Sequence, residues 1–289
     1  MIKLISTTLV CIISLSVFAQ KSREKKPIKS LNIIDHTISI DGRKFEINND
    51  GFPKQIESFF SDNVESFTDK PTRLLYEPIH FHFFNSAKFQ EKMSVDKFDL
   101  ISKTIDSIVW MANSFSPNIK MDVRGKMQSN GFVSYQVNLR ALNDVEFTNI
   151  NFHIPFDKGE AKYLAGLGQK NYLRPDTVKW SWKDGKNIKP AVWIGTDSTG
   201  LYLSINDKKD AINFINGWNN QNKGDIKINI KGSSMLTDVS TGSLVMHKDD
   251  ELSFDFNLIL TPLAEKGGRE GIAKRFNVYR KIDLKESNK

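Results

Sequence analysis

Apolar and polar residues alternate along much of the chain, which is the pattern of β-strands that bury one face. Residues 226–231 alternate at every position, and residues 133–140 place apolar side chains at the odd positions. Two further stretches share the pattern, with faces formed by Leu201, Leu203 and Ile205 and by Leu252, Phe254, Phe256, Leu258 and Leu260. We therefore expect half-buried antiparallel strands. The residues expected inside the core include Val137, Leu139, Phe254, Phe256 and Leu258.

Turn-forming residues separate these stretches at short intervals. They occur at Asp41-Gly42, Asn49-Asp50-Gly51, Ser129-Asn130-Gly131, Lys183-Asp184-Gly185 and Ser198-Thr199-Gly200. Helical patterns are scarce: residues 207–214 suit one or two turns, and glycines weaken the pattern over residues 264–280. Many short strands with frequent turns predict an all-β fold, an antiparallel β-sandwich with little helix. A chain of this length could also form the larger variant, a supersandwich.

The two ends of the chain differ from this central region. Lys3, the apolar run after it and the small residue Ala19 form the pattern of a cleaved signal peptide. The run is shorter than the roughly 20 residues of a membrane-spanning helix. Cys11, the only cysteine, lies inside the run, so we expect neither lipidation nor a disulfide in the mature chain. The expected parts are a signal peptide (1–19), a basic leader (20–30), a β-sandwich domain (31–263) and a charged, poorly ordered C-terminal tail (264–289).

The composition suits an exported globular domain with a sizeable core, because 11% of the residues are aromatic and 20 are Phe. The formal net charge of +7 is spread along the chain. A basic balance favours acidic partners such as sulfated or uronate-bearing glycans, and it also serves solubility alone. No phosphate loop, dinucleotide fingerprint or serine-nucleophile motif occurs. We expect a periplasmic or extracellular protein with no cofactor, no nucleic-acid partner and no transmembrane segment after signal cleavage.

Two groups of residues have metal-binding or catalytic chemistry. His80 and His82 share one side of a strand at a spacing that suits a metal ion, but two ligands do not make a site, and a polar strand face explains them as well. The run from Asp249 through Asp250 to Glu251 is the densest set of carboxylates. Glycosidase chemistry needs two carboxyl groups held apart, one of them kept protonated, whereas a run at a hairpin turn stays ionised. The sequence therefore indicates no catalytic residue and no metal ligand.

The segment from residue 163 to residue 224 holds four of the five tryptophans. Trp180 and Trp182 alternate with a serine and so point to the same side of a strand. Exposed indoles of this kind stack on sugar rings, whereas buried ones fill cores. We expect Trp193 in the core and Trp218 in a loop with a surface role. The predicted ligand or partner face consists of Trp180, Trp182, Trp218, Tyr172, Arg174, Asn219, Asn220 and Lys223.

The order of motifs in this segment resembles the amino-terminal β-sandwich of glycoside hydrolase family 123. The motifs are Tyr163-Leu164-Ala165-Gly166-Leu167-Gly168, Arg174-Pro175, Trp180-Ser181-Trp182, Val192-Trp193-Ile194-Gly195 and Gly200-Leu201. An early hairpin at residues 49–56, a loop at residues 217–224 and a closing strand at residues 256–262 are also similar. The resemblance covers about residues 31–263, nearly the whole mature chain.

The resemblance implies a (β/α)-barrel after the sandwich, with an Asp-Glu pair that hydrolyses N-acetylgalactosaminides with help from the substrate's acetamido group. We expect this chain to end about where that barrel begins, so Asp250 and Glu251 do not inherit the catalytic role. The resemblance therefore implies an exported, non-catalytic module associated with glycan breakdown, which binds carbohydrate or a partner hydrolase containing the barrel. Two alternatives stay open: a component of a truncated or split hydrolase, and an envelope interaction protein without a ligand.

Overall fold

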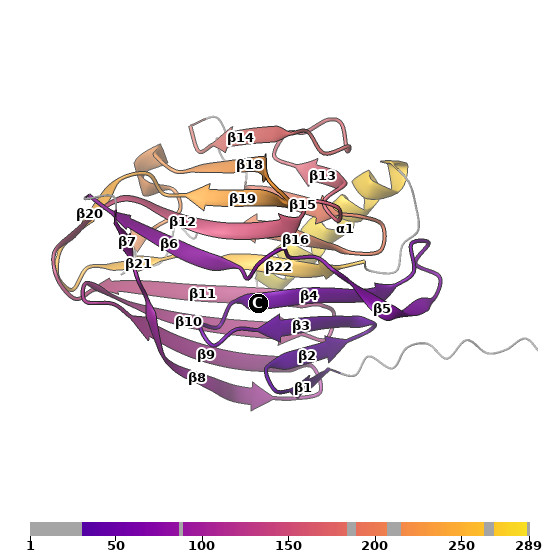
Figure 1. Cartoon of the computed structure of the whole chain (residues 1–289), viewed down its shortest axis with the longest axis horizontal. Helices are drawn as coiled ribbons and strands as arrows, with labels where there is room; N and C mark the ends of the chain where they lie inside the picture. The colour runs from indigo at the N-terminus through magenta and orange to yellow at the C-terminus, as the bar shows by residue number, and fades with distance from the viewer. Residues whose placement is uncertain (1–30, 87–88, 184–188, 207–214, 263–268, 288–289) are drawn as a thin grey trace, which may run out of the picture.

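The computed structural model describes most of the chain between residues 31 and 287. The described residues are 31–86, 89–183, 189–206, 215–262 and 269–287. They form three sheets, one α-helix and one short 3-10 turn, η1 (Asn220–Asn222) (Figure 1). The expected signal peptide, basic leader and helical turns at residues 207–214 lie outside the described residues. The predicted antiparallel β-sandwich with little helix is confirmed.

The largest sheet has ten strands and makes up one layer of the sandwich. Eight of its strands follow each other in the order β13 (Tyr163–Gly166), β15 (Ala191–Gly195), β16 (Gly200–Ile205), β22 (Phe256–Thr261), β11 (Phe132–Ala141), β10 (Ile119–Gln128), β9 (Ser107–Phe115) and β8 (Ser94–Lys103). The short strands β21 (Glu251–Ser253) and β17 (Ile215–Asn216) extend it, and these two pair in parallel.

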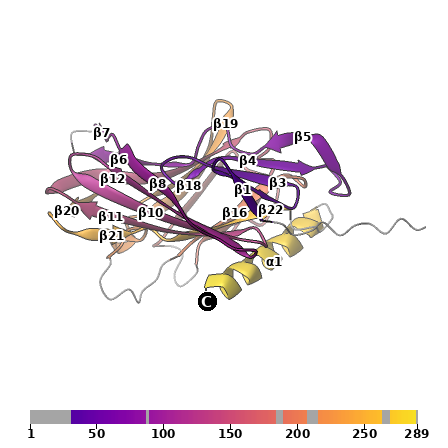
Figure 2. The same cartoon turned by 90° about the horizontal axis from the view of Figure 1, so that it is seen from below.

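The other layer consists of two smaller antiparallel sheets. The seven-stranded sheet has the order β14 (Thr177–Ser181), β18 (Asp225–Lys231), β19 (Ser234–Ser240), β12 (Val145–Asp157), β6 (His80–Asn85) and β7 (Gln90–Glu91), with β20 (Leu244–Met246) beside β12. The five-stranded sheet runs through β1 (Asn32–Ile34), β2 (Thr37–Ile40), β3 (Arg43–Ile47), β4 (Pro53–Phe60) and β5 (Phe67–Arg73). Figure 2 shows both sheets on one side of the ten-stranded sheet and α1 (Arg269–Ser287) on the other.

A continuous aromatic core fills the space between the layers. Phe256 of β22 is fully buried, and its ring centroid lies 4.7 Å from that of Tyr135 and 4.5 Å from that of Phe152. The rings of Trp110 and Phe45, 6.1 Å apart, join β9 to the five-stranded sheet. The residues that the alternation placed inside are all buried, namely Val137, Leu139, Phe254, Phe256 and Leu258.

The expectation of half-buried strands holds for some strands and is wrong for others. β10 and β11 bury nearly every second residue and expose the polar residues between them. β16 and β22 are buried on both faces, and even the polar residues Ser204 and Asn257 are covered. The reason is α1, which packs across the outer face of these two strands and of β13. The stretch containing Leu252 and Phe256 is also divided between β21 and β22.

The expected poorly ordered tail is wrong for most of its length, because residues 269–287 form the helix α1. Ile272 and Tyr279 of the helix are buried in a second core with Trp193, Tyr202 and neighbouring apolar residues of the ten-stranded sheet. A glycine costs a helix about 1 kcal/mol, which tertiary burial readily outweighs. The lysines of α1 and its Arg280 are exposed, whereas Arg275 and Asp283 are buried. The sequence pattern did not predict the helix because few of its residues are apolar, and these contact the ten-stranded sheet along one narrow side of the helix.

Candidate functional site

The tryptophans of the predicted face lie mostly inside the protein. Trp218 is fully buried: its indole Nε1 donates to the Asp255 carbonyl oxygen at 2.9 Å, and its ring lies 5.0 Å from that of Phe254. The expectation of a surface role for Trp218 is therefore wrong. Trp182 is 7% exposed, and Trp180 is half-buried with its ring 5.0 Å from that of Trp182. The glycines beside Trp218 do not indicate a surface loop, because they let the backbone turn closely around a buried ring.

The burial expected of Trp193 is confirmed, since this side chain is 1% exposed. The side chains of Tyr172 and Arg174 have different neighbours. Tyr172 packs against the second core beneath α1. Arg174 is half-buried, with Nη1 3.9 Å from Met235 Sδ, and its Nε has no hydrogen-bond partner among the described residues. The two side chains therefore contact different parts of the sandwich.

The polar residues of the predicted face stabilise their own loop. The Asn219 side chain accepts from the backbone N–H of Asn222, which caps η1. Asn220 Nδ2 donates to the carbonyl oxygens of Thr241 and Ser243, both at 2.9 Å, and Lys223 Nζ donates to Ser243 at 3.3 Å. The structure thus does not bring the eight predicted residues together as one exposed aromatic face.

A third histidine, which the sequence analysis did not place there, lies beside His80 and His82. His153 of β12 is opposite His80 of β6, and the three ring centroids are 4.2 to 5.3 Å apart. His153 Nδ1 pairs with Asp238. Burial, with smaller contributions from the charges of His153 and His80, lowers the pKa of His82 from 6.5 to about 4. Within the described ranges, no three His, Cys, Asp or Glu side chains are arranged to hold a metal ion.

The carboxylate run occupies a turn between β20 and β21. Asp249 forms an exposed ion pair with Arg140 at 2.7 Å, and Asp250 Oδ2 accepts from the backbone N–H of His247 at 2.7 Å. These contacts use the carboxylates to close the turn. The expected position just before a strand is confirmed, but the expected hairpin is wrong, because β20 pairs with β12 and β21 with β11, so the turn links two different sheets.

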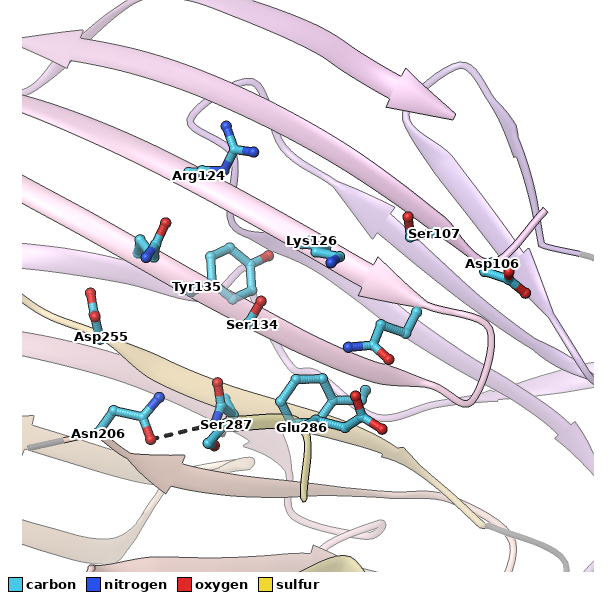
Figure 3. A pocket seen from close by; sticks show the side chains of 14 residues that line it. Asp106, Ser107, Arg124, Lys126, Ser134, Tyr135, Asn206, Asp255, Glu286 and Ser287 are labelled. Atoms are coloured by element: carbon cyan, nitrogen blue, oxygen red, sulfur yellow. Dashed lines mark hydrogen bonds between the residues drawn. The ribbon is translucent and has the colours of Figure 1, made fainter. Parts of the chain in front are cut away.

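A groove of about 420 Å³, lined by both polar and apolar atoms, lies on the outer face of the ten-stranded sheet, next to the last turn of α1 (Figure 3). α1 contacts β11, β13, β16 and β22 on this face, and the groove lies beside the helix over β9, β10 and β11. Its neutral hydrogen-bonding side chains are Ser107, Gln128, Ser134, Gln136, Asn206, Asn257 and Ser287. Its charged side chains are Asp106, Arg124, Lys126, Asp255 and Glu286.

The strand register aligns part of the groove lining in a row. Lys126 of β10 lies opposite Ser134 of β11, which in turn lies opposite Asn257 of β22. Neighbouring strands are about 4.8 Å apart, so an ammonium, a hydroxyl and an amide follow one another across the sheet. They face outward because the alternate residues, such as Val123 and Val133, are buried in the main core. A ligand in the groove therefore meets hydrogen-bonding groups from three strands.

One wall of the groove is held by a buried carboxylate of α1. Asp283 is 2% exposed, and it pairs with Lys189 Nζ at 2.9 Å and accepts from Asn257 Nδ2 at 2.7 Å. Burial, followed by the negative charge of Asp283, raises the pKa of the Tyr202 hydroxyl. Tyr202 therefore stays protonated and donates to Asp283 at 3.3 Å. These bonds fix the end of α1 against the sheet.

The sequence interpretation missed the groove residues because it treated the polar face of each strand as ordinary solvent surface. The signal was present in two strands. The outward positions of β10 carry Arg124, Lys126 and Gln128, and those of β11 carry Ser134 and Gln136. Their pairing could have been inferred from the short turn at residues 129–131. The contribution of α1 could not, since the helix itself was not predicted.

Comparison with known families gives a match over most of the chain. Residues 31–262 match the family described as glycoside hydrolase 123, third domain. The predicted resemblance to this family is confirmed, and the description places the domain third where we expected it at the amino terminus. No curated protein matches the chain in sequence.

Solved structures similar to this chain include two proteins from Lactobacillus acidophilus. A galactose mutarotase related enzyme has 10% identity and a TM-score of 0.45, with 81% of this chain and 100% of that chain covered. A galactose 1-epimerase from strain NCFM has 9% identity and a TM-score of 0.48, with 80% of this chain and 94% of that chain covered. At such values neither activity is transferred to this chain.

Proposed function

The chain belongs to glycoside hydrolase family 123 as its third domain, and from this premise we propose that it is a non-catalytic module that binds carbohydrate in the groove beside α1. The observation that carries the proposal is the groove itself. It joins hydroxyl, amide and charged side chains from four strands and one helix on the outer face of the ten-stranded sheet (Figure 3). Sugars present several hydroxyl groups that both donate and accept, and such a lining can match them.

The size and setting of the groove support a small ligand. Binding sites for small molecules occupy about 300–1,000 Å³, and 420 Å³ lies within this range. The second core beneath α1 gives the groove a rigid base, because Phe132 lines the groove and is 2% exposed. A preformed site loses little conformational entropy on binding.

The proposal includes a place of action and a partner. A signal-peptide pattern at residues 1–19 supports export, and the family supports work alongside a glycoside hydrolase that contains the catalytic barrel. No helix in the described part of the chain is long and apolar enough to cross a membrane. N-acetylgalactosamine is the first ligand to test, given the substrates that the family resemblance implies.

A glycan array with the purified mature protein tests the proposal. The wild type should bind glycans that contain N-acetylgalactosamine. Ser134→Leu places an apolar side chain in the floor of the groove and should abolish this binding. Gln136→Ala should weaken it, and the matched variant Gln90→Ala, on the exposed edge strand β7, should leave it unchanged.

Two array results oppose the proposal. One is the absence of any glycan bound by the wild type. The other is glycan binding that survives Ser134→Leu unchanged, which would place the site elsewhere. Stable association of the wild type with a barrel-containing hydrolase, without glycan binding, would favour the partner-binding alternative.

A further inference from the structure

The network around Asp283 dictates how one groove residue is oriented. Asn257 Nδ2 lies 2.7 Å from Asp283 Oδ1, 2.9 Å from Ser287 Oγ and 3.4 Å from Asn206 Oδ1. A carboxylate only accepts hydrogen bonds, so the nitrogen end of the Asn257 amide must face Asp283. The oxygen end then lies on the opposite side of the amide. Asn257 is itself part of the groove lining.

Asn206 is oriented by a longer contact to the same nitrogen, whose two hydrogens are shared among three acceptors. Its Oδ1 accepts from Asn257 Nδ2, a bond that Figure 3 draws from Asn206. The Nδ2 group of Asn206 therefore lies on the other side of its amide, with two hydrogens to donate. Its backbone N–H donates to the Asp255 carbonyl oxygen at 3.0 Å, which holds the residue at the end of β16.

Asp283 itself has little freedom to change its orientation. It is 2% exposed, and Lys189, Tyr202 and Ser287 also bond to it, at 2.9, 3.3 and 3.3 Å for the shortest contact of each. An ion pair with several supporting hydrogen bonds in a buried site is costly to disrupt. The carboxylate thus fixes the amide orientation at the groove before any ligand arrives.

We propose that Asp283 is a positioning residue that makes Asn257 present an acceptor and Asn206 a donor side by side, and that this pair reads two adjacent hydroxyl groups of one sugar ring. A hydroxyl both donates and accepts, so two neighbouring hydroxyls can give a proton to Asn257 Oδ1 and take one from Asn206 Nδ2. The inference rests on the proposed carbohydrate binding and adds the groups that confer specificity.

Titration calorimetry with N-acetyl-D-galactosamine and its 3-deoxy, 4-deoxy and 6-deoxy analogues tests this inference. For the wild type, removal of either of two adjacent hydroxyls should weaken binding about tenfold, and removal of a distant one should change it far less. Asp283→Ala should weaken binding of N-acetyl-D-galactosamine. It should also abolish the difference in affinity between this sugar and its deoxy analogues, since the two amides then turn freely. A general loss of structure would weaken all ligands in proportion.

The matched control removes a different link between α1 and the sheet. Arg275 Nη2 of α1 donates to Asp197 Oδ1 at 2.5 Å, and neither residue lines the groove. Asp197→Ala should keep both the affinity and the preference among the analogues. In ¹⁵N spectra, the side-chain amide protons of Asn257 should lie downfield in the wild type and in Asp197→Ala, and should lose this shift in Asp283→Ala.

Each outcome has a separate meaning. If the wild type binds none of the four sugars, the inference fails for N-acetylgalactosamine, whereas the proposed function fails only if the array also shows no bound glycan. If the wild type binds and discriminates, but Asp283→Ala discriminates equally well, the proposed function stands and the positioning role of Asp283 is wrong. Equal losses in Asp197→Ala and Asp283→Ala would show that α1 attachment alone matters, which also overturns the inference.

Discussion

Burial of individual aromatic side chains decides which residues are available for function. Indole rings are the largest apolar side chains, and the core between two layers of sheet takes them up first. Trp110, Trp193 and Trp218 are at most 1% exposed, and Trp182 is 7% exposed. A tryptophan-rich sequence segment therefore marked the interior of this sandwich. The groove instead uses short polar side chains on strand faces.

The first residue-scale prediction concerns tryptophan fluorescence. Of the five tryptophans, four are buried and only Trp180 is half-buried. Acrylamide should therefore quench the emission of Trp180 and leave most of the emission of the other four. Trp180→Phe should remove most of the quenchable signal, whereas Trp218→Phe should not. Strong quenching that persists in Trp180→Phe would contradict the burial of the other rings.

The second residue-scale prediction concerns stability in acid. The folded-state pKa of His82 is about 4, below its ordinary value of 6.5, chiefly because the ring is desolvated. The unfolded chain therefore binds more protons below pH 6.5, and the folded state loses stability as the pH falls from 6.5 toward 4. His82→Gln should reduce the difference between urea midpoints measured above pH 6.5 and near pH 4. The exposed control His247→Gln should not reduce it, and an unchanged acid response in His82→Gln would oppose this account.

At the scale of elements, strands could be predicted from the sequence and the helix could not. Alternation in residues 133–140 and 226–231 survives as β11 and β18, because one face of each strand is buried and local spacing records it. β16 and β22 depart from the rule since α1 covers their outer face. That contact joins residues about 80 positions apart, such as Tyr202 and Asp283, and no local pattern reveals it. The groove depends on the same contact, so only its strand half was open to prediction.

The element-scale prediction tests how α1 is held. Tyr279 is 1% exposed, and its ring centroid lies 6.4 Å from that of Trp193 and 6.2 Å from that of Tyr202. Tyr279→Ala should lower the free energy of unfolding by about 3 kcal/mol in urea titration. Leu284→Ala, at a position 53% exposed on the same helix, should cost less than about 1 kcal/mol. Equal, small costs for both variants would mean that α1 does not pack against the sheet.

For the whole molecule, the two layers of the sandwich enclose the main core, and the groove lies on the outer face of one layer. The seven- and five-stranded sheets share the main core with one face of the ten-stranded sheet, and the other face divides between α1 and the groove (Figure 2). The family could be predicted from the order of the sequence motifs, and the fold class from the alternation of apolar and polar residues. Charge spread along the chain did not reveal the groove, because the Arg and Lys of β10 meet the acidic groups of other segments only after folding.

A prediction on the whole molecule concerns export. The pattern of residues 1–19 predicts cleavage after Ala19. Mass spectrometry of the protein recovered outside the cytoplasm of the producing cell should find Gln20, or a residue close to it, at the amino terminus. An intact Met1 in that fraction would exclude signal cleavage.

The most direct test of carbohydrate binding in the groove is chemical-shift mapping with N-acetyl-D-galactosamine. Backbone amide shifts of ¹⁵N-labelled protein, followed to saturation, report where the sugar lies. The account predicts that the largest changes fall on β10, β11 and the last turn of α1, at residues such as Lys126, Ser134 and Ser287. Saturable changes centred on the seven-stranded sheet, or no saturable change anywhere, would contradict it.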